Sequence, residues 1–185
     1  MKAKSPNLIA YAGGLIIDHL FALLAALLTS NIINFFSTDG IPVLNLIISA
    51  TVYFLICYVD AWNRGNTDSN RIRLGIMPDN KFRGVLAGLI AAIPGGILAL
   101  LATVAELGIA KFYDVFAVDL FTALNRVWHL PLGTLYLFVN ENPFGNFLFP
   151  LFIPVVSGFG YVMGLKEISL KYIFVYRNRE EEDSE

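Results

Sequence analysis

The clearest signal in the chain is the apolar segment Leu8–Ile33, which reads LIAYAGGLIIDHLFALLAALLTSNII. A helix needs about 20 mostly apolar residues to cross a bilayer, and this segment provides them. Three more segments have the same character: Val43–Val59, Val85–Ala105 and Phe147–Leu165. The first segment is too long for the apolar part of a signal peptide and carries Asp18 within it. Four transmembrane helices are therefore predicted.

The composition agrees with a membrane protein. Of the 185 residues, 56% are hydrophobic and only 15% are charged, whereas a soluble domain carries about 25% charged residues. This balance excludes a typical soluble enzyme and a disordered chain. A net charge of −2 excludes the basic surface of a nucleic-acid binder. The single cysteine, Cys57, excludes an intrachain disulfide and a CxxC metal site. We expect the lipid bilayer as a partner, no nucleic acid, no cofactor and no metal.

The basic residues predict the orientation. All but two of the 13 Lys and Arg residues lie before the first span, between the second and third spans, or after the fourth. Four spans place these three regions on one side, and cytoplasmic segments carry the excess of Lys and Arg. Both termini are therefore expected in the cytoplasm. Lys111 and Arg126 are left on the outer side, in a long segment between the third and fourth spans.

This outer segment contains an amphipathic stretch at residues 111–130. Its strongly polar side chains fall on one side of a helix, which predicts a helix lying in the outer interface with that side toward water. Two alternatives stay open: a fifth span over this stretch, and a re-entrant turn at residues 132–139. The expected polar face contains Asp114, Asp119, Arg126 and His129.

Two polar residues lie near the middle of the first span. Asp18 is about ten residues into it, roughly 15 Å deep at 1.5 Å per residue. A carboxylate there costs several kcal/mol unless it is paired, neutral or hydrated. Asp18 and His19 are therefore candidates for a proton or cation relay or for substrate contact. The alternative is a structural hydrogen bond to a neighbouring helix. Gly14 and Ala22 share the Asp18 side, which predicts a closely packed neighbour there.

The third span carries a stripe of small residues at helical spacing, including Gly88, Ala92 and Gly96. Such stripes allow close approach of helix backbones. The sequence Pro94-Gly95-Gly96 interrupts this helix near its middle, and Pro150 and Pro154 interrupt the fourth span. Interrupted helices are typical of binding sites at mid-membrane, and they also occur in ordinary membrane helices.

The segment between the second and third spans, residues 60–84, is expected to be a polar cytoplasmic loop. Its basic residues are expected near anionic lipid headgroups. Asn66, Asp68 and Asn70 alternate as in a calcium loop, but Arg71 and Met77 stand where Gly and Glu are required, so an EF-hand is excluded. Residues 1–177 are expected to form one transmembrane domain, followed by an acidic disordered tail at 178–185. His19 and His129 are expected on opposite sides of the proposed layout, so they are not expected to share a metal within one protomer.

Two resemblances add to this picture. Ile16-Ile17-Asp18, followed by Gly65-Asn66-Thr67 and Gly75-Ile76, resembles the pattern of RDD-type bacterial membrane proteins. The arginine that this family carries about two turns before the Asp is absent, and Ala10 and Tyr11 stand there. Residues 160–177 look like the ending of small uncharacterised four-span membrane proteins of Gram-positive bacteria. These resemblances imply a helical protein of the bacterial cytoplasmic membrane.

The sequence therefore predicts an all-α polytopic membrane protein with four transmembrane helices and one outer interfacial helix. The expected role is a non-catalytic subunit or accessory component, assembling with itself or with a larger membrane-protein partner. One alternative is a small ion- or proton-coupled transporter or channel that uses Asp18. A third is a membrane-embedded lipid-modifying enzyme that uses Asp114, Asp119 or His129.

Overall fold

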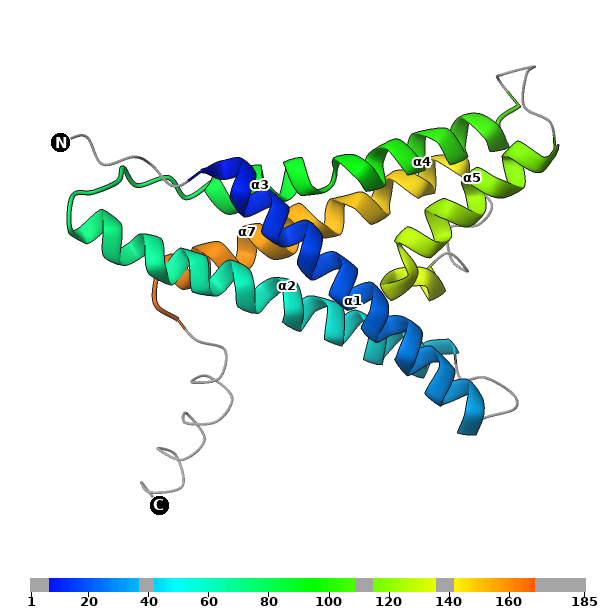
Figure 1. The fold of residues 1–185 in the computed structure, drawn as a ribbon, viewed down its shortest axis with the longest axis horizontal. Coiled ribbons are helices and arrows are strands. Elements are labelled where there is room, and N and C mark those ends of the chain that lie inside the picture. Colours follow the sequence, from blue (N-terminus) through cyan, green and yellow to red (C-terminus); the bar gives the residue numbers. More distant parts are fainter. Residues whose placement is uncertain (1–6, 37–41, 109–114, 136–141, 169–185) are drawn as a thin grey trace.

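The computed structural model describes residues 7–36, 42–108, 115–135 and 142–168, which contain helices and no strands (Figure 1). The all-α prediction is confirmed over these residues. Three helices are long and apolar enough to cross a membrane, and the bent pair α3–α4 makes a fourth if it is counted as one span. The elements are α1 (Leu8–Phe36), α2 (Pro42–Arg73), α3 (Arg83–Ala91), α4 (Ile93–Glu106), α5 (Val115–Trp128), η1 (Leu130–Leu135), η2 (Pro143–Leu151) and α7 (Phe152–Leu165).

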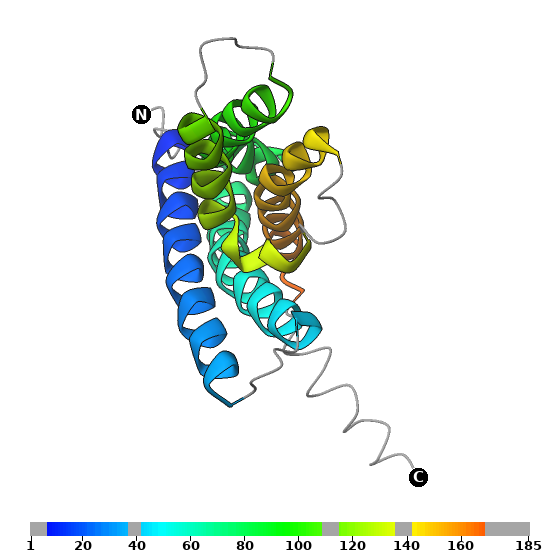
Figure 2. The same cartoon turned by 90° about the vertical axis from the view of Figure 1, so that its right-hand side faces the viewer.

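The helices form an elongated bundle in which α7 lies between α2 and α3 (Figures 1 and 2). Small residues let α7 approach both neighbours closely. Gly158 lies against Val85 of α3, and Gly160 lies against Tyr58 and Ala61 of α2. The Ser157 hydroxyl donates a hydrogen bond to the Gly84 carbonyl over 3.0 Å. These small residues of α7 therefore serve helix packing within the chain itself.

Helix α2 is longer than its apolar span. The region expected as a loop from residue 60 is helical up to Arg73, because its last turns pack against α7 and Asp68 pairs with Arg83 of α3. The helix ends in a Schellman motif, in which the Ile76 N–H donates to the Arg71 carbonyl and the Gly75 N–H donates to the Ile72 carbonyl. Gly75 has a φ of 68°, a conformation that favours glycine.

The predicted interruptions at Pro94 and Pro150 are present, whereas α7 continues through Pro154. Helices α3 and α4 meet at Ala92 with a bend of 47°, and Pro94 lies in the first turn of α4. Proline lacks the N–H needed to continue the hydrogen bonds of α3, and its fixed φ suits a helix start. The candidate span Pro143–Leu165 begins as the 3₁₀ segment η2, which contains Pro150, and continues as α7 from Phe152.

Helix α5 packs along α4 in the opposite direction (Figure 1). Its Thr122 donates a hydrogen bond to Glu106 near the end of α4, whereas Trp128 and His129 lie against Gly95 near the start of α4. Segment η1 follows and contacts α1 and α2. Helix α5 and η1 therefore form a hairpin that returns to the middle of the bundle, and an amphipathic helix is present in the predicted stretch.

Candidate functional site

Asp18 lies in a groove of about 450 Å³ between α1 and α2. Asp60 and Asn63 of α2 line the same groove, together with Leu55, Ile56 and Val59. Asp18 is half-buried, and its Oδ2 atom receives no hydrogen bond from the described residues. Asp60 accepts a 2.6 Å hydrogen bond from Nε of Arg64. Two carboxylates from two helices therefore line one groove, with a single arginine bound to one of them.

Arg64 crosses from α2 to α1. Its guanidinium lies over the ring of Tyr11, 4.7 Å from the centroid, and against Gly14. A methyl group at Gly14 would occupy the place of the guanidinium, so Gly14 makes room for a side chain and not for a helix backbone. Arg64 thus supplies a positive charge at the level of Tyr11, where the sequence of α1 has none.

His19 and His129 lie close together, and the prediction that the layout of the helices separates them is wrong. Nε2 of His19 donates a 3.0 Å hydrogen bond to the Trp128 carbonyl, since a carbonyl oxygen can only accept. The rings of His19 and Trp128 are 4.9 Å apart. The α5–η1 hairpin causes this contact by carrying His129 back to the level of His19.

His129 itself is buried, with 3% of its surface exposed. Nδ1 donates a 3.0 Å hydrogen bond to the Asn125 carbonyl, so Nε2 is the unprotonated nitrogen of the neutral ring. Burial lowers the pKa of His129 to about 4, because the imidazolium would lose its hydration. His129 is therefore neutral at pH 7. Its Nε2 and Nε1 of Trp128 have no hydrogen-bond partner among the described residues.

The predicted outer polar face is divided by this packing. Asp119 and Arg126 are exposed. His129 is not on a water-facing side, and the neighbouring Asn125 is also buried. The side of α5 that carries Leu120, Leu124 and Val127 is exposed instead. Asp114 lies outside the described residues.

Polar contacts explain why the side of α5 that carries Asn125 turns inward. Nδ2 of Asn125 donates to Asn146 over 3.1 Å, and Nδ2 of Asn146 donates to Glu106 over 3.2 Å. Buried amides need such partners, because an unpaired buried polar group costs about 1–3 kcal/mol. Thr103 of α4 donates a 2.9 Å hydrogen bond to the Pro143 carbonyl. These contacts join α4, α5 and η2 at one end of the bundle.

The other predicted packing residues behave differently from one another. Ala22 of α1 is fully buried, and Ala92 lies at the α3–α4 break with 8% exposed. Gly88 lies against Ser157 and Pro154 of α7. A side chain at Gly96 would meet nothing within 4 Å, so this glycine faces away from its own bundle.

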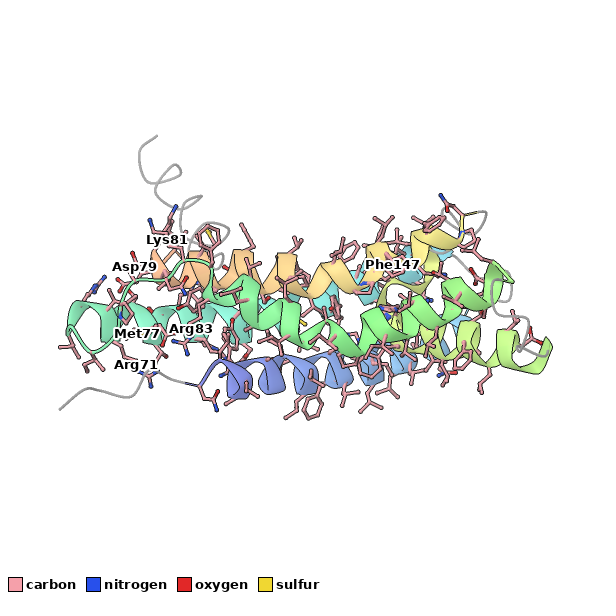
Figure 3. The ribbon with its side chains drawn as sticks, turned by 90° about the horizontal axis from the view of Figure 1, so that it is seen from above. Arg71, Met77, Asp79, Lys81, Arg83 and Phe147 are labelled. Atoms are coloured by element: carbon pink, nitrogen blue, oxygen red, sulfur yellow. The ribbon has the colours of Figure 1, made fainter. Side chains whose placement is uncertain are left out.

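A second polar centre lies at the end of the bundle where α2 ends and α3 begins (Figure 3). Asp68 is 4% exposed and accepts three contacts. Its Oδ2 receives the Tyr161 hydroxyl at 3.0 Å and Nη1 of Arg83 at 3.2 Å, and its Oδ1 receives Nη1 of Arg71 at 3.1 Å. The sequence does not indicate this centre, because Asp68 and Tyr161 are far apart in the chain and the polar composition of residues 60–84 predicts a loop.

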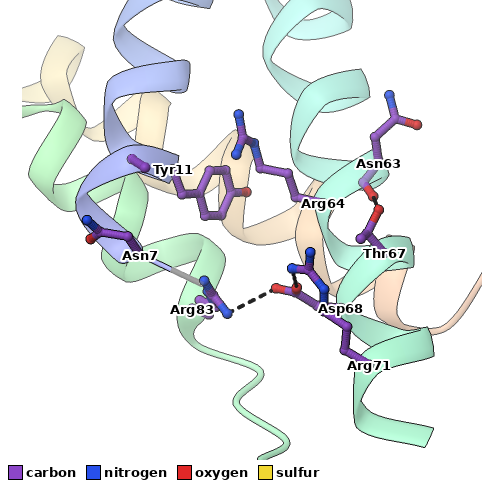
Figure 4. Close-up of a pocket in the computed structure, with 9 residues that line it drawn as sticks. Asn7, Tyr11, Asn63, Arg64, Thr67, Asp68, Arg71 and Arg83 are labelled. Atoms are coloured by element: carbon purple, nitrogen blue, oxygen red, sulfur yellow. Dashed lines mark hydrogen bonds and ion pairs between the residues drawn. The ribbon is translucent and has the colours of Figure 1, made fainter. Parts of the chain in front are cut away.

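The centre around Asp68 forms one wall of a cavity of about 370 Å³ (Figure 4). Arg64, Arg71 and Arg83 all line this cavity. Within the described residues, no group of three or more His, Cys, Asp or Glu side chains is placed to hold a metal ion. Comparisons with protein-family models, curated proteins and solved structures find no match for the chain.

Proposed function

We propose that the chain is a non-catalytic subunit or accessory component of a membrane complex. The observation that carries this proposal is the groove of Asp18 and Asp60 on the surface of α1 and α2. Leu55 and Val59 beside it are 49% and 50% exposed, which suits contact with lipid or with another helix. The groove thus combines an apolar surround with two acidic groups.

A carboxylate at this depth is costly in hydrocarbon. Translocon scales assign about 2.5–3.5 kcal/mol to an Asp at the centre of a membrane helix. Among the described residues, Asp18 meets the Asp60 carboxylate, its Oδ2 has no further hydrogen-bond partner, and Nε of Arg64 is already bound to Asp60. A partner helix that brings a Lys, Arg or amide donor to the groove would remove this cost. We therefore propose that the occupant of the groove is a transmembrane helix with a hydrogen-bond donor at the level of Asp18.

Purification in mild detergent followed by native mass measurement tests this proposal. We expect the wild-type chain to carry a second copy or another membrane protein. Asp18→Leu should release that partner, and Asp18→Asn should retain it, because an amide still accepts a hydrogen bond. Leu24→Ala is the matched control, since Leu24 is 55% exposed on α1 outside the groove. A wild-type chain that is monomeric and alone in native membranes would overturn the proposal.

A second candidate function is proton- or cation-coupled transport. It is favoured by the row of polar side chains from Asp18 through Asp60 to Asn63, because Asn63 lines both the groove and the cavity at the end of the bundle. Asp18→Asn preserves the volume and hydrogen bonding but cannot titrate. If the chain is a transporter, this variant should assemble normally and lose pH-dependent flux in vesicles that contain only this protein. Equal flux in both proteins would exclude a role of Asp18 in transport, and the absence of flux in the wild type would exclude this function.

For the arrangement in the membrane, we propose four spans with both termini cytoplasmic, α3–α4 being one bent span. We further propose that α5 and η1 enter from the outer side as a re-entrant hairpin in place of a flat interfacial helix. The contact between Trp128 and His19 supports this, because His19 is well inside α1. The lipid-modifying alternative gains no support, since Asp119 is exposed while His129 is buried.

A further inference from the structure

The cavity next to Asp68 has the composition of an anion site. It lies between the first turn of α1, the last turns of α2 and the start of α3 (Figure 4). Three arginines and one aspartate line it, and Asp60 pairs with Arg64 next to it, which leaves an excess of one positive charge. Its volume of about 370 Å³ is in the range of small-molecule pockets.

The arginines are held in place before any ligand arrives. The side chain of Arg83 is 7% exposed and contacts Asp68 and the Met77 sulfur. Asp68 also holds Arg71, whose side chain is 42% exposed at the mouth of the cavity. Side chains that are fixed in this way lose little conformational entropy when they bind.

Arg64 is fixed on the opposite wall. Asp60 binds its Nε atom, and the ring of Tyr11 supports its guanidinium face. Its side chain is 37% exposed. The cavity therefore has one buried arginine beside Asp68 and two partly exposed arginines at its edges. Guanidinium groups match the planar, multiple hydrogen bonding of phosphate oxygens better than ammonium groups do.

We infer that this cavity binds a phosphate-bearing anion. Such a group neutralises the excess charge and accepts hydrogen bonds from Arg64 and Arg71 at the mouth, while Asn63 at the rim offers an amide to a neighbouring hydroxyl. The Asp68 carboxylate does not repel it strongly, because Asp68 is engaged by Arg71, Arg83 and Tyr161.

The phosphate has two possible sources with the same chemistry, a phospholipid headgroup or a soluble phosphate. The position of the cavity favours the headgroup. It includes Asn7 and Tyr11, at the very start of the apolar helix α1, and Arg83, at the start of α3. Ends of membrane helices lie at the level of the headgroups, where clustered basic residues bind anionic lipids.

Binding to the intact protein in detergent tests the inference. The probes are phosphatidylglycerol, phosphatidylcholine and inorganic phosphate, and the readout is lipid retention in native mass spectra together with the dissociation constant. We expect phosphatidylglycerol to bind about tenfold more tightly than phosphatidylcholine, which is a ratio that one good ionic contact can produce. If inorganic phosphate bound with the affinity expected for phosphatidylglycerol and neither lipid bound, the site would belong to a soluble ligand. That result would still support the inference.

Variants at the mouth provide the decisive comparison. Arg71→Gln and, separately, Arg64→Gln should each weaken phosphatidylglycerol binding about tenfold. Arg73→Gln is the matched control, because it removes the same charge from a residue that pairs with Glu167 and does not line the cavity. Thermal unfolding of each variant checks the fold. If Arg73→Gln weakened phosphatidylglycerol binding equally, the binding would come from general surface charge. If the three probes bound equally well, the cavity would not be a phosphate site. Either result would overturn the inference.

Discussion

Gly65 of α2 and Gly164 of α7 lie directly against each other where the two helices cross. A methyl group on Gly164 would come within 3.0 Å of the Gly65 Cα atom and would also strike the Trp62 carbonyl. A methyl group on Gly65 would strike the Tyr161 carbonyl. Backbone atoms of both helices fill this space, and they cannot move aside as the tip of a flexible side chain can.

Gly65→Ala and Gly164→Ala should therefore each destabilise the protein by about 1–3 kcal/mol, the usual cost of overpacking. Thermal unfolding in detergent, followed by circular dichroism, measures the change. Gly96→Ala and Gly13→Ala are matched controls, because nothing lies within 4 Å of the added methyl group at either position. We expect the controls to be neutral or slightly stabilising, since alanine favours helix. An equal loss of stability in all four variants would contradict close packing of α2 and α7 at these two glycines.

Asp68→Asn should destabilise the protein by about 3 kcal/mol, because it leaves the buried Arg83 guanidinium without the opposite charge of Asp68. Tyr161→Phe removes one hydrogen bond to the same carboxylate and should cost about 1 kcal/mol. Asp60→Asn is a useful comparison, since the Asp60–Arg64 pair is partly exposed and should contribute less. The measurement is the unfolding temperature in one detergent. An Asp68→Asn effect no larger than that of Asp60→Asn would exclude a buried charge centre.

Stability should depend on pH through His129. Burial lowers its pKa to about 4 in the folded chain, whereas an unfolded histidine has a pKa of about 6.5. The unfolded state therefore binds more protons between these two values, so this group's contribution to stability falls as the pH drops from about 6.5 to about 4. One proton limits the slope to about 1.4 kcal/mol per pH unit.

The measurement is the unfolding temperature of wild type and His129→Gln at pH 7.5 and pH 5. Other titrating groups act in both proteins, so the difference between the two pH dependences isolates His129. We expect the wild type to lose more stability on acidification than the variant. Identical pH dependences would mean that His129 is hydrated or paired in the folded state.

Opposite ends of the bundle should label from opposite sides of the membrane. In a Cys57→Ser background, Lys81→Cys should react with a membrane-impermeant thiol reagent only after the cells are permeabilised. Asn142→Cys should react from outside in intact cells. Both side chains are exposed, so protein packing does not block either reaction. Labelling of Lys81→Cys in intact cells would reverse the proposed orientation.

Some features follow from the sequence because their cause is local. The long apolar runs predict helices around Leu8–Phe36 and at the other three apolar segments, since a helix satisfies its backbone hydrogen bonds within itself. Pro94 and Pro150 predict the two interruptions, because a missing N–H acts on the neighbouring turns wherever the helix lies. The small residues Gly88 and Ala22 predict buried helix contacts.

The candidate sites depend on the tertiary structure. Helix α2 continues to Arg73 because α7 and α3 provide Tyr161 and Arg83 for Asp68, and hydropathy contains no record of those partners. The orientation of α5 is also decided by its partners. Amphipathicity separates polar from apolar sides, but Asn125 turns inward to bond Asn146, which leaves Leu124 on the outside.

The contact between His19 and Trp128, and with it the position of His129, joins residues from helices far apart in the chain. No pattern within either segment indicates this contact, because it follows from the path of the whole α5–η1 hairpin beside α4. The sequence alone therefore determines which segments are helical and where they break. Only the packing of those helices decides which polar side chains meet, since hydrogen bonds and ion pairs act over a few ångströms in space, whatever the separation along the chain.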